Sequence, residues 1–342
     1  MNEHTSVGVD CGYGEVKATL GKHAIMFPSV YGHGLDIQFD EDKIAAAYPG
    51  DRIVHDGQEW WVGELAASPH MPIAQQLALH GRTAADQRSG NADRLLLIKA
   101  ALGKLFTGRV ANGQVVCIHL GTGLPVDHMA GAEVFKAQLM GQHDIQTDQG
   151  HFIAHIESVF VMPQPLGTVY AHLLTAKGEL NGKFDAERIA VVDVGTLTTD
   201  IAVDDDGAFV SSMSGSIEVG LSIVTEAVRR DYNQRFGEFP SAATIHQIMR
   251  TRNAGKHLKD GDFSAVIEAA SAPLVSGVLS LMAQKWGRGT QLPIIFVTGG
   301  GAQLVLRAVE AEYQNSLVQI TADPIMSNVT GFQHYAAFRA TV

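Results

Sequence analysis

The sequence has few cysteines, few charged side chains and a shortage of basic ones. Only 2 of its 342 residues are cysteine, and charged residues make up 18%. Asp and Glu outnumber Lys and Arg by 36 to 25, which gives a formal net charge of −11 and disfavours direct binding of nucleic acid. Two cysteines cannot form a disulfide framework, and Cys11 and Cys117 both lie in apolar, strand-like segments. We therefore expect two buried, reduced thiols in a cytoplasmic protein.

Other features are missing as well. No uninterrupted apolar stretch approaches the ~20 residues of a membrane span, and the polar first residues lead directly into a strand, so neither a span nor a secretory signal is expected. The 15 histidines fall in no ligand spacing such as HExxH, so we expect them on the surface or in the core. With 46% hydrophobic residues, the chain is long enough for two domains, each with its own core.

One arrangement of residues occurs near the start of each half of the chain. The first copy is Val7-Gly-Val-Asp10-Cys-Gly12-Tyr-Gly14-Glu-Val-Lys17, and the second is Ala190-Val-Val-Asp193-Val-Gly195-Thr196-Leu-Thr198-Thr199-Asp200. Each is an apolar strand that ends in aspartate, breaks into a turn and resumes as a second strand, at 16–20 and 200–203. Glycine permits the close approach and positive φ angles of a loop around a phosphate, and aspartate can hold Mg²⁺. Two such hairpins facing one another would bind a nucleotide polyphosphate from both sides.

A third segment, Ile295-Phe-Val-Thr298-Gly299-Gly300-Gly301-Ala302, combines an apolar strand with three glycines at a helix N-terminus. Free N–H groups and the positive end of the helix dipole favour an anion or a nucleotide there. The segment is not GxGxxG, and no GxxxxGK[ST] occurs in the chain. The sequence is therefore typical of neither a Rossmann nor a P-loop protein.

Hydrophobic periodicity places the remaining elements. We expect further strands at 23–28, 52–55, 59–63, 114–120, 152–156, 157–162, 189–194, 208–213 and 292–298. We expect helices at 93–108, 166–175, 219–236, 241–252, 263–287, 302–312 and 328–339, and a helix or strand edge at 134–140. Residues 32–93 are less regular and are interpreted as an insertion, in which Trp60-Trp61 is local core or a subunit contact. The Asp204–Asp206 run is interpreted as a hairpin turn.

Taken together and in order, these segments resemble the actin, Hsp70 and sugar-kinase nucleotide fold. Within it they are similar to the bacterial and archaeal actin-like ATPases of the ParM/StbA plasmid-segregation branch. The segments at 10–17 and 193–200 resemble its two phosphate loops, and 298–301 resembles its adenosine loop. Residues 120–125 and 215–228 are similar to the connecting segments, and 332–338 suit the closing helix. The motifs run from residue 7 to residue 339.

The resemblance implies an α/β fold of two duplicated actin-like (ribonuclease H-like) domains with a nucleotide cleft between them. The first domain would cover 1–165, with the insertion at about 32–93 and a closing helix at about 323–342, and the second 166–322. The implied catalytic residues are Asp10, Gln164 and Asp193. The implied phosphate-binding residues are Cys11, Gly12, Tyr13, Gly14, Lys17, Gly195, Thr196, Leu197 and Thr198. Adenosine would contact Gly220, Gly299, Gly300 and Gly301, and Asp10 and Asp193 would hold Mg²⁺, through water.

Gln164 takes the place at which the family orients the attacking water. ParM-type proteins usually carry Glu there, whereas eukaryotic actin carries Gln. An amide is no strong base, but it can position a water in line with the γ-phosphate, which is much of what phosphoryl transfer needs. The alternative is that Gln164 caps the helix that follows it. Lys17 has an alternative too, as an exposed lysine on an edge.

The resemblance implies a slow ATPase that forms filaments of itself with ATP or GTP and Mg²⁺, in plasmid segregation or another cytoskeletal role. A DNA-bound adaptor protein would be its partner, without direct nucleic-acid binding. Candidates for base contacts lie at Thr244 to Arg252. One alternative is a small-molecule kinase of the same fold, which would need a carboxylate to activate its acceptor. Others are an Hsp70-like module, disfavoured because the chain ends with the fold, and a non-polymerising ATP-binding module.

Overall fold

The computed structural model describes residues 4–36, 41–79, 84–182, 188–255 and 261–341, with the backbone alone for 84–91. The chain divides into two compact units. Unit 1 is Met1–Asp185 together with Ile325–Val342, and unit 2 is Ala186–Pro324. The division falls after Asp185 instead of at the expected 165, because helix α5 packs on the C-terminal helix and so stays with unit 1.

Unit 1 is built on one sheet, with the order β3-β2-β1-β8-β10-β9-β5-β6-β4-β7 in the described part of the chain. Its strands are β1 (Thr5–Cys11), β2 (Glu15–Leu20), β3 (His23–Pro28), β4 (Val30–His33), β5 (Arg52–His55), β6 (Gln58–Val62), β7 (Leu77–Ala78), β8 (Val115–Leu124), β9 (Gly141–Thr147) and β10 (Gly150–Pro163). Strands β1, β8 and β10 are parallel and central, and their inward-facing residues are apolar. The strands expected in the 32–93 insertion are confirmed as β5 and β6, which extend the sheet beyond β9.

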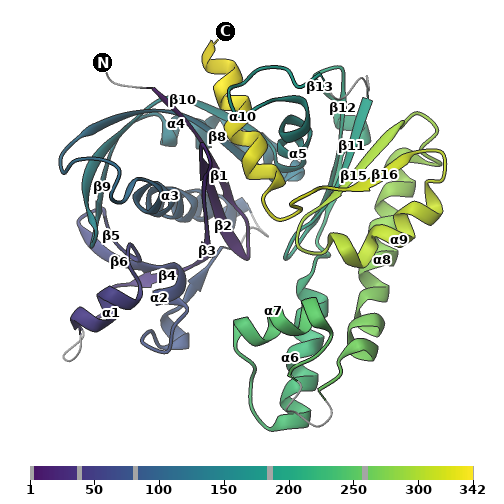
Figure 1. Cartoon of the computed structure of the whole chain (residues 1–342), viewed down its shortest axis with the longest axis horizontal. Coiled ribbons are helices and arrows are strands. Elements are labelled where there is room, and N and C mark those ends of the chain that lie inside the picture. The colour runs from purple at the N-terminus through teal and green to yellow at the C-terminus, as the bar shows by residue number, and fades with distance from the viewer. Residues whose placement is uncertain (1–3, 37–40, 80–83, 183–187, 256–260, 342) are drawn as a thin grey trace. The chain divides into compact units, whose positions relative to one another are not determined.

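Helices cover both faces of this sheet. They are α1 (Glu41–Ala47), α2 (Gly63–Ala66), α3 (Ala84–Phe106), α4 (Ala132–Leu139), α5 (Gln164–Leu173) and α10 (Ser327–Thr341). The sheet curves around α3, as Figure 1 shows, and α10 lies on the opposite face across β1 and β8. Helix α10 approaches so closely that a Cβ on Gly121 would lie 2.0 Å from the Phe332 carbonyl oxygen. The C-terminal segment is therefore part of unit 1.

Unit 2 repeats the central pattern of unit 1. Its strands are β11 (Arg188–Val194), β12 (Thr199–Asp205), β13 (Ala208–Phe209), β14 (Gly215–Ile217), β15 (Ile294–Thr298) and β16 (Leu317–Ile320). The order β13-β12-β11-β15-β16 matches β3-β2-β1-β8-β10 in strand direction, since an antiparallel hairpin precedes two parallel neighbours in both. The helices are α6 (Ser222–Phe236), α7 (Ala242–Thr251), α8 (Ser264–Trp286) and α9 (Ala302–Glu312). The expected duplication is thus visible in the topology.

Several expectations about element limits were wrong, and some have a visible local reason. The strands expected at 152–156 and 157–162 are one strand, β10, with a bulge at Glu157. The strand expected at 208–213 stops at Phe209, because the Ser214 hydroxyl donates to the Val210 carbonyl and the chain forms a 3₁₀ turn at Ser211–Met213. The helix expected from 219 begins at Ser222, because the backbone N–H groups of Leu221 and Ser222 bond to the loop at 195–196. Helix α3 begins at Ala84 instead of 93.

Among the described residues, α8 alone is long and apolar enough, by length and composition, to cross a membrane, with a mean hydropathy of 1.6. One side of this helix belongs to the core of unit 2, where Ile267, Leu274, Val278 and Met282 are fully buried. Its packing against α6 and α9 accounts for the apolar composition of this side.

Candidate nucleotide site

The first phosphate-loop motif is a four-residue turn between β1 and β2. Cys11 and Val16 form the last strand pair, and the Gly12 N–H donates to the Glu15 carbonyl at 3.1 Å. A Cβ on Gly12 would lie 3.0 Å from this carbonyl, and neither Gly12 nor Gly14 has a positive φ. Gly12 therefore serves close approach, and the expectation of positive φ angles was wrong here. The Ser29 hydroxyl donates to the Gly12 carbonyl at 2.6 Å and fixes the turn.

Asp10 links two of the predicted site residues. Its carboxyl group is buried, and Oδ1 accepts a hydrogen bond from Gln164 Nε2 at 2.9 Å. Lys17, which faces Asp10 across the hairpin, holds its Nζ 3.7 Å from Oδ2. The Lys17 side chain is only 17% exposed, so the structure does not support the alternative of an exposed edge lysine. The three residues form a compact polar cluster at the end of β1.

Gln164 is held in this cluster by its place in the fold. It is the first residue of α5, directly after Pro163 ends β10. A Cβ on Gly123 would lie 2.9 Å from Gln164 Cγ, so a glycine at this point of β8 makes room for the side chain. The amide bonds to Asp10 across the sheet and does not cap its own helix. Because Nε2 donates to Asp10, Oε1 is the atom that can accept from a water.

The side chains of Cys11 and Tyr13, two of the predicted phosphate-binding residues, belong to the core side of the turn. Burial, and then the charge of Asp10, raises the pKa of the Cys11 thiol to about 12, so it stays protonated and unreactive. Neither cysteine forms a disulfide and both are buried, which confirms the expectation of two buried thiols. Tyr13 packs partly against the core of unit 1. Any contact of these two with a phosphate would come from the backbone of the turn.

The second phosphate-loop motif is the same turn in unit 2. Val194 and Thr199 form the last pair of β11 and β12, and the Gly195 N–H donates to the Thr198 carbonyl at 2.9 Å. Gly195 has no positive φ, and its Cβ would lie 3.1 Å from this carbonyl. Thr196 is exposed, and Leu197 and Thr198 are half-buried. The loop therefore presents its tip to solvent.

Asp200 stabilises this loop from below. It is buried, and Oδ2 accepts from the Thr198 hydroxyl at 2.9 Å, while Oδ1 accepts from the Ser216 hydroxyl on β14. Two hydroxyl donors compensate a charge that burial would otherwise penalise. The sequence motif included Asp200, but its partner Ser216 was missed, because the contact depends on the pairing of β14 with β12.

The glycine segment after β15 lies against the end of β11. Gly299 has a φ of +84°, and a Cβ there would lie 2.4 Å from Asp193 Oδ1, so no other residue fits without strain. The Gly301 N–H donates to the Val194 carbonyl at 3.0 Å, and α9 begins at the next residue. The structure thus brings Asp193 and the glycine segment together in unit 2.

Gly220 lies at the base of the second loop. A Cβ on Gly220 would lie 2.6 Å from the Thr196 carbonyl oxygen, and the next two N–H groups donate to the carbonyls of Gly195 and Thr196. The position predicted to contact adenosine therefore packs against the phosphate-loop backbone. Its immediate effect is to fix the loop on the start of α6.

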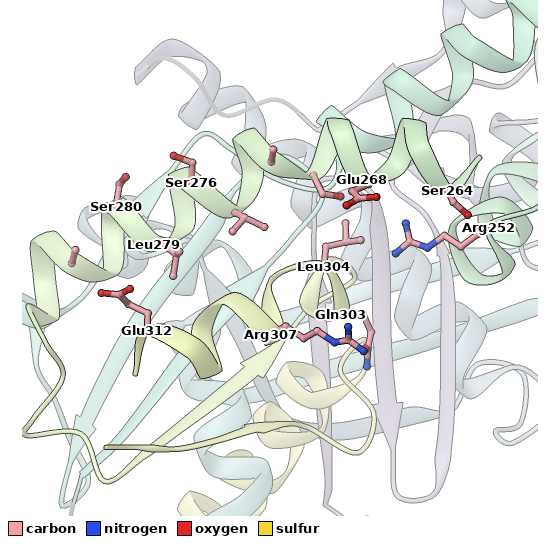
Figure 2. A pocket seen from close by; sticks show the side chains of 14 residues that line it. Arg252, Ser264, Glu268, Ser276, Leu279, Ser280, Gln303, Leu304, Arg307 and Glu312 are labelled. Carbon is pink, nitrogen blue, oxygen red and sulfur yellow. The ribbon is translucent and has the colours of Figure 1, made fainter. Parts of the chain in front are cut away.

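A groove of about 1100 Å³ runs between α8 and α9 in unit 2 (Figure 2). Arg252, Ser264 and Glu268 lie together at one end, and Gln303 and Arg307 project from the first turns of α9. Arg252 belongs to the segment predicted to supply base contacts. The sequence analysis missed the others, although small or polar residues recur at helical spacing along α8, at Ser264, Glu268, Ser271, Ala272, Ser276, Ser280 and Ala283.

The carboxylates of each unit can be compared, unit by unit, with what Mg²⁺ requires. Asp10 is buried beside a lysine, which disfavours a direct metal bond, and Asp200 is occupied by two hydroxyls. Asp193 is half-buried at a strand end. Because Mg²⁺ keeps most of its waters and takes few carboxylates, a single aspartate in each unit, Asp10 in unit 1 or Asp193 in unit 2, has the chemistry to contact the water shell of the ion.

Two family models match the chain. Residues 8–167 match the N-terminal domain of the actin-like proteins, and residues 191–311 match the C-terminal domain of the archaeal actin homologue MreB-like family. The two matches fall in unit 1 and unit 2 respectively. The fold and the paired loops define the class of two-domain actin-like proteins. The chain therefore combines an actin-like N-terminal domain with a C-terminal domain of the archaeal MreB-like type.

Solved structures agree on the fold. The crystal structure of the archaeal actin homologue Ta0583 is 19% identical, with a TM-score of 0.76 over 98% of this chain and 99% of that one. The apo pSK41 ParM protein is 18% identical, with a TM-score of 0.71 over 100% and 99%. A 15-stranded ParM filament from Clostridium botulinum is 20% identical, with a TM-score of 0.71 over 98% and 99%. Among curated protein sequences, none matches this chain.

Proposed function

We propose that the protein is an actin-like ATPase that assembles into filaments when it binds ATP or GTP with Mg²⁺. The observation that carries this proposal is the repeated hairpin. In both units a buried strand carries an aspartate next to its last residue, and a four-residue turn then closes with the same backbone hydrogen bond. The turn residues 12–15 are half-buried, and Thr196 is exposed in the second turn. Such turns present backbone dipoles suited to phosphate oxygens.

In the proposed complex, the backbone N–H groups of residues 12–14 and 195–197 bind the β- and γ-phosphates. Lys17 neutralises charge that develops during transfer of the γ-phosphoryl group. Asp10 and Asp193 would hold the water shell of a bound Mg²⁺, which would supply charge neutralisation on the phosphate oxygens. Asp200 keeps Thr198 and its loop in place through the bond at 2.9 Å.

Gln164 positions the attacking water in this proposal. Its Nε2 is engaged by Asp10, so the orientation of the amide is fixed before the nucleotide binds. An amide orients water without removing its proton efficiently, so hydrolysis is slow. Slow hydrolysis suits a polymer whose nucleotide state changes after assembly, and the loss of γ-phosphate contacts would permit the conformational change.

The nucleoside is proposed to extend from Gly299, Gly300 and Gly301 into the end of the α8/α9 groove lined by Arg252 and Glu268. The arginine side chain can donate hydrogen bonds and the glutamate side chain can accept them, so together they can bind a base and a ribose. Among the similar structures, Ta0583 was solved in complex with ADP and the Bacillus thuringiensis ParM with AMPPNP. We propose the same ligand class for this chain.

Filament formation and the cellular role are proposed from the relatives. The similar structures include the ParM filament from Clostridium botulinum and the Alp12 filament. The proposed partners are further copies of this chain and an adaptor protein on plasmid DNA. The net charge of −11 disfavours direct contact with DNA.

The experiment is 90° light scattering and pelleting on addition of Mg-ATP, Mg-ADP or Mg-GTP, with phosphate release followed in parallel. Scattering that rises with the triphosphate and decays as phosphate appears is the expected result. Asp193→Ala abolishes both signals, whereas Asp127→Ala, which removes an exposed carboxylate elsewhere, keeps them. Steady release of phosphate without scattering at any protein concentration would contradict the filament proposal. The next step would then be to test small molecules as phosphoryl acceptors.

A further inference from the structure

Three potential metal ligands that lie far apart in the sequence meet on one face of the unit 1 sheet. They are His4, just before β1, His119 in β8 and Glu157 in β10, and one ligand atom from each lies within 4.8 Å of the other two. His4 Nδ1 is 2.7 Å from Glu157 Oε2, and the rings of His4 and His119 stack at 5.5 Å. The spacing of these three residues in the sequence matches no metal-binding motif, so the sequence alone does not predict the cluster.

The fold gives these side chains a common direction. Ile118 and Leu120 face the core on either side of His119, so the imidazole points to the opposite face. The pairing of β8 with β10 shifts register between Ile156 and Ser158, and Glu157 is the extra residue of this bulge. Bulges turn a side chain out of its regular alternation and are frequent at functional sites. Here the bulge sets Glu157 and Ser158 beside the histidines.

His119 has the environment of an oriented ligand. Its Nδ1 lies 2.7 Å from the Ser158 hydroxyl, which leaves Nε2 as the ligand atom. A hydrogen bond from the second ring nitrogen is the usual way in which proteins orient a metal-binding imidazole. A fourth group is close, since His155 Nε2 lies 4.0 Å from Glu157 Oε1, and its Nδ1 is buried with no hydrogen-bond partner among the described residues.

We propose that His4, His119 and Glu157 form a binding site for a divalent transition-metal ion of the Zn²⁺ class. Two imidazoles and one carboxylate are a donor set that Zn²⁺ prefers, with the remaining position open to water or to His155. Tetrahedral bonds of about 2.0–2.1 Å separate ligand atoms by about 3.4 Å, so small side-chain rotations convert the cluster into the site. The site is separate from the phosphate loop, because Asp10 lies six residues, about 20 Å, further along β1 than His4.

The test is a calorimetric titration of the metal-free full chain with Zn²⁺, alongside the visible absorption spectrum of the Co²⁺ form. We expect one saturable equivalent per chain and a tetrahedral Co²⁺ spectrum. His4→Ala and Glu157→Gln lower the Zn²⁺ affinity at least 10-fold and remove the spectrum, with circular dichroism unchanged. His4 is exposed and terminal to the strand, so its replacement leaves the fold intact even if Glu157→Gln does not.

Two control variants separate the site from scattered histidines. His151→Ala breaks a comparable histidine–carboxylate pair, with Asp144, and His246→Ala removes an exposed histidine from α7. Both are expected to keep the Zn²⁺ affinity within about twofold. If the chain binds no saturable equivalent of Zn²⁺, the proposal is overturned, because His4 and Glu157 are then only a hydrogen-bonded pair. An equal loss of Zn²⁺ affinity in His151→Ala also overturns it, because binding would then not depend on this site.

Discussion

The β1–β2 hairpin of unit 1 and the β11–β12 hairpin of unit 2 share a backbone and differ in charge. The loops have the same length and the same closing hydrogen bond, from Gly12 to Glu15 and from Gly195 to Thr198. At the equivalent register positions, Asp10 faces Lys17, whereas Asp193 faces Asp200. The backbone geometry of the turn therefore tolerates either pair of charges, and the surroundings must stabilise each of them differently.

The neighbouring side chains show how the buried carboxylate of each hairpin is stabilised. In unit 1 the lysine forms an ion pair with the buried Asp10 at 3.7 Å, and Gln164 donates a hydrogen bond to the same carboxylate. In unit 2 the buried Asp200 takes both its hydrogen bonds from the hydroxyls of Thr198 and Ser216. Unit 1 therefore carries a cation and an amide, and unit 2 carries two carboxylates. Under the proposed function, unit 1 supplies phosphate neutralisation through Lys17 and water positioning through Gln164, while each unit contributes one aspartate, Asp10 or Asp193, to the water shell of the metal.

The largest effect is expected when unit 1 is given the charges of unit 2. Lys17→Asp sets two carboxylates opposite each other without the hydroxyls that stabilise Asp200. We expect phosphate release to fall at least about 100-fold. The free energy of unfolding should fall by roughly 3 kcal/mol, because the buried Asp10 loses its cation. Urea unfolding followed by circular dichroism, together with a phosphate-release assay, measures both.

Lys22→Asp is the matched control for this variant. Lys22 is exposed in the two-residue turn between β2 and β3, so the same change of charge should leave rate and stability nearly unchanged. A similar loss in both variants would show that net charge, and not the pair with Asp10, decides the result.

The second largest effect is expected at Gly123, which makes room for Gln164. A Cβ there would lie 2.4 Å from Phe332 Cζ and 2.9 Å from Gln164 Cγ. Gly123→Ala should cost about 2 kcal/mol of stability by overpacking. It should also slow phosphate release between roughly 10- and 100-fold, because Gln164 is displaced from Asp10. Gly131→Ala, where no atom lies within 4 Å of a Cβ, is the control and should keep the wild-type rate. An unchanged rate in Gly123→Ala would show that hydrolysis does not depend on the position of Gln164.

The local parts of this comparison could be predicted from the sequence. A strand, an aspartate, a glycine turn and a second strand are coded within about eleven residues, so both hairpins and the register of Lys17 follow from counting along the motif. The same holds for the glycine segment after β15. The expected positive φ angles do not occur at Gly12, Gly14 or Gly195, and Gly12 and Gly195 instead permit close approach to a carbonyl.

The non-local parts could not be predicted. Ser216 reaches Asp200 only because β14 pairs with β12, and Gly220 meets the second loop only because α6 begins on its carbonyls. Strand β9 was missed because its sequence, GQHDIQT, is largely polar and buries only Ile145. The meeting of His4, His119 and Glu157 depends on two strand pairings and a bulge. Sequence spacing carries no signal for contacts of this kind.

A smaller effect is expected when Gln164 takes the residue usual in the ParM branch. Gln164→Glu puts a second carboxyl group within hydrogen-bond distance of Asp10, and two such groups cannot both ionise at their ordinary pKa. The pair therefore holds a proton at acidic pH and loses it as the pH rises. Phosphate release should increase roughly fivefold between about pH 5 and pH 8, as the base forms.

The pH profile of Gln164→Glu has two references. The wild-type protein has no titrating group at this position, so its profile should be flatter over the same range. Gln164→Ala removes both the amide and any base, and its rate should be low at every pH. A profile of Gln164→Glu that coincides with the wild-type profile would show that residue 164 does not contact the attacking water.

The smallest effect concerns the outer turns of the two hairpins. Both are two-residue turns, Gly21-Lys22 in unit 1 and Asp206-Gly207 in unit 2, but the second has the buried Asp204 beside it. Burial raises the pKa of Asp204, although its Oδ1 accepts from the Gly207 N–H at 2.9 Å, and Oδ2 is buried with no hydrogen-bond partner among the described residues. The folded chain therefore holds this proton more tightly than the unfolded chain, and stability is lost as the pH rises through the folded pKa.

Asp204→Asn keeps the acceptor for Gly207 and removes the charge. We expect the variant to be more stable than the wild type by roughly 1 kcal/mol at pH 7, with the difference vanishing as the pH falls to about 4. Thermal melting at the two pH values measures it. Asp206→Asn, at the exposed neighbour, should change stability by less than about 0.5 kcal/mol at either pH. A gain in stability for Asp204→Asn that persists at pH 4 would mean that it comes from the hydrogen bonding of the turn. The buried charge would then not be what distinguishes this turn from that of unit 1.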